Sequence, residues 1–175
     1  MIHQLNYSKG GLMGDRCDVE LTILKLHKKR VTKVFDMYAD FSLSRRQAYD
    51  EHEVSSAKKV PLISFYFEDV NYGQLDFLQD LPAKGIPYDY SWGQGDEYDP
   101  GNGYCRYLED GTLFERVISD EDINPPFASL VELIDKPFAL AEYVKNHANW
   151  MKIPPWEDQD KYADKFRTLQ LIGVK

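Results

Sequence analysis

The chain has 175 residues, of which 43% are apolar and 14% aromatic, and its formal net charge is −8. This length predicts a single domain, and this apolar content predicts a hydrophobic core, which excludes a globally disordered chain. The negative charge argues against direct binding of nucleic acid or of an anionic membrane surface. No apolar run approaches the roughly 20 residues that span a bilayer, and residues 1–11 lack a secretory-type apolar run. We therefore expect a cytoplasmic protein.

The first third of the chain predicts a strand followed by a helix. Residues 1–14 hold three glycines and predict a flexible preface. Apolar and polar residues then alternate over 18–26, as in a half-buried strand. Residues 28–39 place apolar side chains at helical spacing, so we expect an amphipathic helix whose inward stripe is Val31, Val34, Phe35 and Tyr38. A second, short helix is expected over 44–53.

The middle of the chain alternates between apolar runs and breaks. Residues 62–70 are almost continuously apolar at first, which is typical of a central strand. Asn71 is a suitable cap for a helix over 72–81. Alternating apolar side chains predict a third strand over 86–92, whereas four glycines and a proline predict a loop over 93–103.

A β-hairpin is the clearest local prediction. Two alternating, aromatic-rich runs, 104–108 and 112–118, flank the dipeptide Asp110-Gly111. Asp-Gly between such runs favours a tight turn, because both residues tolerate the left-handed backbone conformation that the turn requires.

The last third of the chain predicts helices, over 127–134, over 137–150 and from about residue 157 onward. The element order is strand, helix, strand, helix, strand, strand, strand, then helices. It predicts an α+β fold with a mixed, mainly antiparallel sheet of about five strands and helices on one face. Residues 15–124 would form the core, and residues 125–175 a helical extension packed on it, within one domain.

Two cysteines, Cys17 and Cys105, are too few for a disulfide scaffold. Both lie in predicted strands, so we expect buried thiols. Catalysis by Cys105 is disfavoured, because its acidic surroundings raise the pKa of a thiol and only Arg106 opposes this.

Metal chemistry has two candidate locations. Four acids on two predicted strands could meet in a cleft and bind a divalent cation, namely Asp18, Glu20, Glu68 and Asp69. The loop 96–102 also offers oxygen ligands, but it lacks the spacing of a calcium loop. The four histidines are scattered and form no metal motif. Outward strand faces carry acids routinely, so we predict no metal, no cofactor and no catalytic residue.

The negative charge is concentrated in one block. Residues 65–124 hold fourteen acidic and three basic side chains, a net charge of −11, together with twelve of the 24 aromatic residues. Acidic and aromatic side chains on one surface suit a positively charged partner, since aromatic rings also stack on arginine. The predicted partner-binding residues are Asp89, Tyr90, Trp92, Asp96, Glu97, Tyr98, Asp99, Tyr107, Glu109 and Asp110.

These features favour binding over catalysis. We expect a non-enzymatic protein whose acidic face engages the basic, nucleic-acid-binding surface of another protein or a nuclease. In composition and charge layout the chain resembles DNA-mimic inhibitors carried by phages and plasmids, which block restriction or RNA-guided nucleases. The comparison is an analogy of composition and not of a motif.

Three alternatives stay open at this point. The first is an immunity-type protein that neutralises a nuclease toxin, and the second is a small metal-dependent hydrolase or nuclease. The third is a self-assembling structural protein, in which the basic run 25–33 pairs with the acidic block of another copy. The sequence leaves the oligomeric state and the identity of the partner open.

Overall fold

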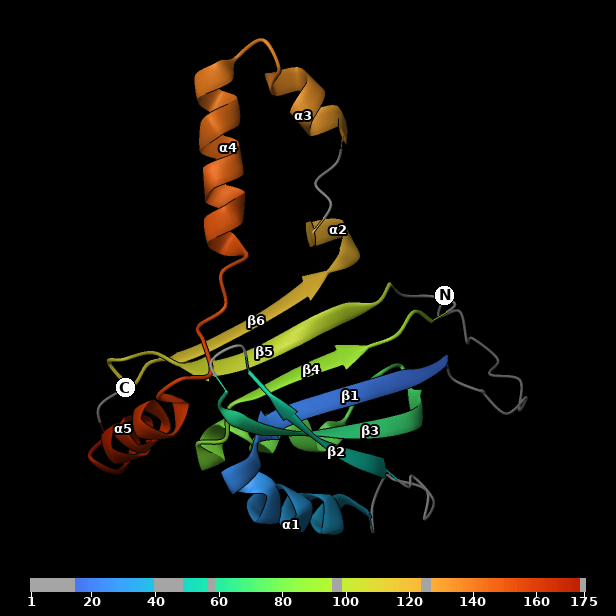
Figure 1. Cartoon of the computed structure of the whole chain (residues 1–175), viewed down its shortest axis with the longest axis vertical. Coiled ribbons are helices and arrows are strands. Elements are labelled where there is room, and N and C mark those ends of the chain that lie inside the picture. The colour runs from blue at the N-terminus through green and yellow to red at the C-terminus, as the bar shows by residue number, and fades with distance from the viewer. Residues whose placement is uncertain (1–14, 40–48, 57–58, 96–98, 124–126, 174–175) are drawn as a thin grey trace, which may run out of the picture.

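A computed structural model describes residues 15–39, 49–56, 59–95, 99–123 and 127–173 of the chain. These residues form an α+β fold built on one antiparallel sheet of six strands, in the spatial order β2-β3-β1-β4-β5-β6 (Figure 1). The strands are β1 (Arg16–Leu24), β2 (Tyr49–Ser55), β3 (Pro61–Asn71), β4 (Tyr88–Trp92), β5 (Gly101–Tyr107) and β6 (Leu113–Ser119). The predicted α+β class is confirmed.

Two predictions about segments beside strands are wrong. The helix predicted over 44–53 is absent from its described part, because residues 49–53 belong to β2, which pairs along its whole length with β3; residues 44–48 lie outside the described residues. Ion pairs support this edge strand, because Lys28 contacts Glu51 and Lys25 contacts Glu53, each at 2.5 Å. The predicted loop 93–103 ends earlier, since β5 already begins at Gly101.

The predicted α-helix over 72–81 is also replaced. Strand β3 runs on to Asn71, and Tyr72 and Gly73 then adopt positive φ values of 52° and 60°, which break a regular helix. Two short 3₁₀ helices follow, η2 (Asp76–Asp80) and η3 (Pro82–Lys84). The buried apolar residues of this segment are Leu75, Phe77, Leu78 and Leu81, and the three leucines recur at every third residue, as on one side of a 3₁₀ turn.

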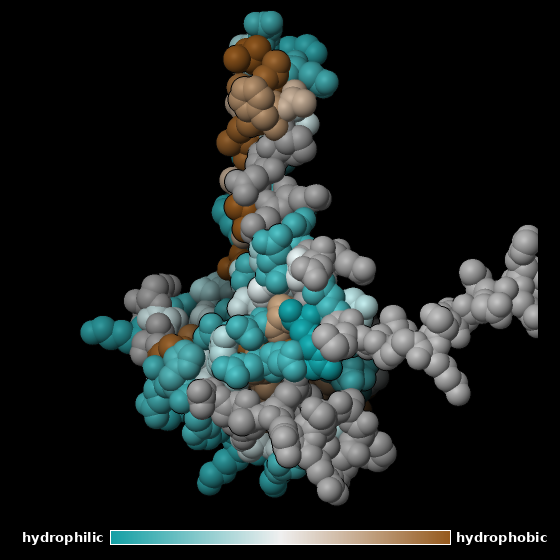
Figure 2. All heavy atoms as spheres, turned by 90° about the vertical axis from the view of Figure 1, so that its right-hand side faces the viewer, coloured by the Kyte–Doolittle hydropathy of each residue, from teal (hydrophilic) through white to brown (hydrophobic). Residues whose placement is uncertain are grey.

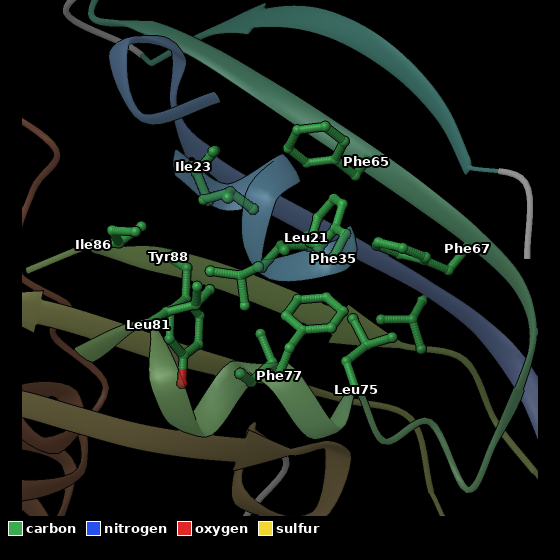
Figure 3. Close-up of a cluster of buried hydrophobic side chains, with 14 of the residues drawn as sticks. Leu21, Ile23, Phe35, Phe65, Phe67, Leu75, Phe77, Leu81, Ile86 and Tyr88 are labelled. Carbon is green, nitrogen blue, oxygen red and sulfur yellow. The ribbon is translucent and has the colours of Figure 1, made fainter. Parts of the chain in front are cut away.

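The core lies between the sheet and helix α1 (Lys28–Ala39), which follows a short 3₁₀ turn η1 (Lys25–His27). Phe35 of α1 packs against three aromatic rings, with centroid distances of 5.1 Å to Phe65, 5.5 Å to Phe67 and 4.6 Å to Phe77 (Figure 3). The predicted stripe of α1 is confirmed, because Val31, Val34 and Phe35 are buried. Helix α1 and the 3₁₀ segments thus share one face of the sheet.

The C-terminal helices divide into two groups. Helix α5 (Gln159–Leu171) packs beside β5, and its Gln159 and Ala163 are buried. The other helices follow β6: α2 (Asp120–Ile123), α3 (Phe127–Leu133) and α4 (Pro137–Trp150). In Figure 1, α3 and α4 form an arm that projects away from the sheet. We call residues 127–150 the helical arm.

Candidate binding surface

Asp89, a predicted partner-binding residue, is engaged inside the protein. Alternation in β4 turns Asp89 away from Tyr88 and Tyr90, onto the outer face of the sheet. There its carboxylate contacts the guanidinium of Arg106 on β5 at 2.5 Å, and the Arg106 side chain is only 2% exposed. Burial raises the pKa of Asp89, and Arg106 partly offsets that rise. Asp89 therefore neutralises a buried cation instead of presenting charge to a partner.

The segment between α4 and α5 covers this ion pair. The Trp156 ring lies over the Arg106 guanidinium at 3.6 Å, and Nε of Arg106 donates to the Pro154 carbonyl at 3.2 Å. Nη1 of Arg106 donates to the Tyr88 carbonyl at 2.8 Å. Arg106 thus ties the chain after the arm to the middle of the sheet.

Tyr90 and Trp92 lie on the core face of β4 and are half-buried. Their rings stack on each other at a centroid distance of 5.0 Å. The rings cover the opposite residues of β5, so that a Cβ at Gly103 would overlap the Tyr90 ring and one at Gly101 would overlap the Trp92 ring. These glycines make room for the aromatic pair, which belongs to the edge of the core and keeps part of its surface accessible.

Tyr107 is fully buried, which removes it from the predicted partner-facing set. Its hydroxyl donates to the Pro82 carbonyl at 2.7 Å, and its ring lies 5.0 Å from that of Phe166. The reason is strand alternation, because Tyr107 shares the core face of β5 with Cys105. Sequence adjacency to exposed acids had suggested the opposite.

The predicted hairpin turn is confirmed, and Glu109 and Asp110 are exposed in it. The Asp110 carboxylate accepts from the Thr112 backbone N–H at 2.8 Å, and this bond lowers the pKa of Asp110. The Glu109 carbonyl accepts from Lys165 of α5 at 3.0 Å. This turn lies at the opposite end of β5 from Asp99, so the predicted acidic residues do not form one cluster.

The remaining predicted residues surround the loop after β4. Asp96, Glu97 and Tyr98 lie outside the described residues. Asp99 is exposed, and its carbonyl accepts from Nε1 of Trp92 at 2.9 Å. The loop begins beside β1, because the Gly93 N–H donates to the Asp18 carbonyl at 3.0 Å.

A β-bulge gathers acids at the same end of the sheet. The pairing of β1 with β3 shifts between Cys17 and Val19, so that Asp18 faces two residues, Glu68 and Asp69. Asp69 has a φ of 57°, a left-handed conformation that aspartate tolerates better than most residues. We call Asp18, Glu20, Glu68, Asp69 and Asp99 the acidic end. Figure 2 looks toward this end of the sheet and shows mainly hydrophilic colours there.

Internal contacts hold several side chains of the acidic end in place. The Tyr66 hydroxyl donates to Asp18 at 2.6 Å, which raises the pKa of Tyr66 to about 12. Arg16 pairs with Asp69 at 2.9 Å, and His52 lies 3.4 Å from Glu20. Four of these acids are nonetheless exposed, with 70% of the Asp69 side chain accessible, and Glu20 is partly exposed, with 41% of its side chain accessible.

The structure brings the four acids of the metal hypothesis onto neighbouring strands. Within the described residues, however, no three His, Cys, Asp or Glu side chains are placed to hold a metal ion. Cys17 and Cys105 are buried free thiols, as expected, and β4 separates their strands. Burial raises the pKa of the Cys105 thiol to about 12, which suppresses the thiolate that nucleophilic chemistry requires.

A hollow of about 530 Å³ opens between the β5–β6 hairpin and α5, lined mainly by Leu113, Phe166 and Leu169. It lies at the hairpin end of the sheet, away from the acidic end. Among the described helices, none is long and apolar enough to cross a membrane.

Comparison of the chain with protein-family models, with curated proteins and with solved structures gave no match. The function therefore has to be inferred from the site itself.

The sequence does not predict that Arg106 forms a buried ion pair with Asp89 and contacts the segment after the arm. Arg106 and Asp89 both occupy polar positions of alternating strands, so their pattern places them on the outer face. Their contact, however, depends on the pairing of β4 with β5, which the pattern does not specify.

Proposed function

We propose that this chain is a non-enzymatic binding protein whose acidic end engages a basic, nucleic-acid-binding surface of a partner protein. A DNA-mimic inhibitor of a defence nuclease, encoded by a phage or plasmid and active in the cytoplasm, is the specific form of this proposal. The observation that supports it is the β-bulge at which Glu68 and Asp69 of β3 lie opposite Asp18 of β1. Glu20 follows two residues after Asp18 on the same strand.

The geometry of a strand explains why these acids suit such a partner. Side chains on one face of a strand recur at about 6–7 Å, and neighbouring strands lie about 4.8 Å apart. Asp18 and Glu20 recur at this interval on one face of β1, and the bulge adds Glu68 and Asp69 opposite Asp18, so several negative charges lie close together, as the phosphates of a nucleic acid do. A surface shaped to bind phosphates would therefore meet acids at comparable intervals.

The first test is capture of partners from a bacterial lysate at low and at high salt, with duplex DNA as competitor and mass spectrometry as the readout. Electrostatic contacts between exposed groups weaken as salt screens them. The proposal expects a nucleic-acid-binding protein that is released both by salt and by DNA. Capture that resists both would contradict it.

The second test assigns the interaction to the acidic end. One triple variant removes charge there, Asp18→Asn, Glu20→Gln and Glu68→Gln. A matched variant removes the same charge from exposed acids elsewhere, Asp36→Asn, Asp76→Asn and Glu115→Gln. Both variants have the same net charge, so a difference between them reports position and not overall charge.

We expect the first triple variant to lose capture of the partner, while the matched variant retains it. Equal loss in both variants would indicate a general charge effect and would contradict the assignment. Thermal unfolding of each variant checks that the fold is intact, and Asp18→Asn preserves an acceptor for the Tyr66 hydroxyl.

A further inference from the structure

The hollow at the hairpin end of the sheet is separate from the acidic end and has no part in the proposed function. Its volume of about 530 Å³ lies within the roughly 300–1,000 Å³ that is typical of small-molecule sites. One wall is formed by residues 111–113, and the other by the C-terminal half of α5 with Gly173. In Figure 1, α5 lies beside the turn that joins β5 and β6. Two segments that are distant in the chain therefore enclose this space.

Hydrogen bonds hold the two walls in place. Oε1 of Gln159, the first residue of α5, accepts from the Tyr107 backbone N–H at 2.8 Å, and Nε2 of Gln159 donates to the Tyr107 carbonyl at 3.1 Å. Nearer the turn, Nζ of Lys165 donates to the Glu109 carbonyl at 3.0 Å. Gln159 is buried, and a hydrogen bond in a buried setting is stronger than one in water. The hollow is therefore preformed, as small-molecule sites usually are.

The floor of the hollow is apolar. Leu113, Phe166 and Leu169 supply it, and all three are half-buried. The Phe166 ring packs on Tyr107 at a centroid distance of 5.0 Å, and Phe166 also lines the hollow. Aromatic rings favour offset-stacked or edge-to-face contacts with other rings. A ligand that carries an aromatic ring therefore has a matching surface in this floor.

The polar side chains that line the hollow are uncharged. They are Thr112 and Gln170, both exposed, and none of the described lining residues carries a charge. Two charged groups beside the hollow are engaged elsewhere, because Asp110 accepts from the Thr112 N–H and Lys165 donates to the Glu109 carbonyl. A charge that moves from water into an apolar site loses free energy unless it finds a partner there. This lining therefore favours a neutral ligand.

Glycines shape both walls. Gly173 follows α5 with a φ of 73°, and a Cβ there would meet no atom of the described residues within 4 Å. Gly111, on the opposite wall, has a φ of 86°, and a Cβ there would lie 3.0 Å from Cδ1 of Leu169. The missing side chain at Gly173 leaves the hollow accessible, whereas the one at Gly111 lets the turn approach Leu169 closely.

We propose that this hollow binds a small, neutral, largely apolar molecule that carries an aromatic ring and a hydrogen-bonding group. The ring stacks on Phe166 and packs against Leu113 and Leu169. The polar group of the ligand faces Thr112 or Gln170 at the edge of the hollow.

The size of the hollow favours a small molecule over a protein partner. Seven described residues line it. A standard protein interface uses about 20–30 residues on each side. The lining can therefore enclose a ring and its substituent, but it is too small to hold a second protein by itself.

The primary experiment is a titration of the ¹⁵N-labelled full chain with indole, followed by two-dimensional NMR of the backbone amides. Indole has an aromatic ring and one N–H donor, and it carries no charge. We expect a dissociation constant of roughly 1 mM, because a probe of about nine heavy atoms makes few contacts. The largest shifts should occur at the amides of Gly111, Leu113, Leu169 and Gly173.

Two charged relatives of indole test the class of ligand. Indole-3-acetate is an anion and tryptamine is a cation, and both carry the same ring. We expect each to bind the hollow about fivefold more weakly than indole, since the lining offers a charge no partner. Salt at about 0.15 M screens the general attraction of a cation to a chain with a net charge of −8.

A pair of variants on one helix tests the position of the site. Leu169→Gln makes the floor polar, and we expect it to weaken indole binding about fivefold through lost apolar contact. Leu171→Gln makes the same change two residues further along α5, where the side chain is 88% exposed and does not line the hollow. This control variant should bind indole within twofold of the native chain. Thermal unfolding of both variants checks the fold.

The proposal is overturned if indole causes no saturable shifts up to about 10 mM, tenfold above the expected dissociation constant. Shifts concentrated on the helical arm, or tighter binding of either charged probe, would also overturn it, as would equal affinities of the two glutamine variants. The comparison of the three probes uses the native chain, so it holds even if Leu169→Gln does not fold. None of these readouts involves the acidic end, so they test the hollow separately from the proposed function.

Discussion

The sheet together with α1 and the 3₁₀ segments, which we call the body, differs from the helical arm in how its aromatic residues are packed. In the body, α1 and the strands bury aromatic rings against one another, and Phe65, Phe67 and Phe77 are each at most 1% exposed. In the arm, Phe127 and Phe138 are more than three-quarters exposed. Residues of the same type therefore pack in the core in one region and lie on the surface in the other.

The largest contrast is expected between two phenylalanine substitutions. Phe35→Ala removes a buried ring that contacts three others, and we expect a loss of about 3–5 kcal/mol in the free energy of unfolding. Phe138→Ala, in the exposed arm, should change that free energy by about 0.5 kcal/mol or less in the monomer. Urea denaturation at low protein concentration measures both. Similar losses for the two variants would contradict the division between body and arm.

The buried ion pair between β4 and β5, which the segment after the arm covers, should give the next largest effect. Asp89→Leu leaves the Arg106 guanidinium buried without its carboxylate, and we expect a loss of about 3 kcal/mol. The double variant Asp89→Leu/Arg106→Met removes both charges. Its loss in unfolding free energy should be smaller than the losses of the single variants Asp89→Leu and Arg106→Met added together. A double-mutant cycle by urea denaturation measures this coupling. Additive losses would show that the pair does not interact as the structure indicates.

The His27 imidazole, which lies where the body meets α5, makes the free energy of unfolding depend on pH. Burial, reinforced by Arg30, lowers the pKa of His27 from 6.5 to about 4. Nδ1 of His27 lies 3.3 Å from Arg30 and accepts from it, which leaves the proton on Nε2, 3.7 Å from Asp160. The folded chain therefore binds a proton on His27 less readily than the unfolded chain.

The sign of the effect follows directly. Stability from the neutral imidazole is complete above pH 6.5 and is lost as the pH falls toward 4, by up to about 3 kcal/mol. His27→Gln should flatten the unfolding free energy between pH 6.5 and 4, relative to the native chain. Parallel slopes for the native chain and His27→Gln would contradict the shift.

Elements with a strong internal pattern could be predicted from the sequence. Helix α1 begins and ends where its apolar spacing places it, as does α4, and the turn at Asp110-Gly111 is present. Strand β2 could not be predicted, because its charged residues have no apolar alternation. It is held by pairing with β3 and by two lysines from a distant part of the chain.

The predicted binding residues show the same limit. Tyr107 and Asp110 are three positions apart, yet one is fully buried and the other exposed at a turn. A charged block in the sequence becomes a surface only after strand alternation and pairing have assigned each side chain to a face. The acidic end depends on a bulge between Asp18 and the pair Glu68 and Asp69, which arises from the register of β1 with β3.

The smallest expected effect concerns the hairpin turn, which belongs to the body but contacts α5. Gly111 has a φ of 86°, and a Cβ there would lie 3.0 Å from Leu169 and 3.2 Å from the Phe166 backbone nitrogen. Gly111→Val should therefore cost about 1–2 kcal/mol through backbone strain and crowding. Gly93→Ala is a suitable control, since its Cβ would meet no atom closer than 3.8 Å. Equal thermal unfolding midpoints for the two variants would contradict both the strained backbone at Gly111 and the close contact of α5 with the hairpin.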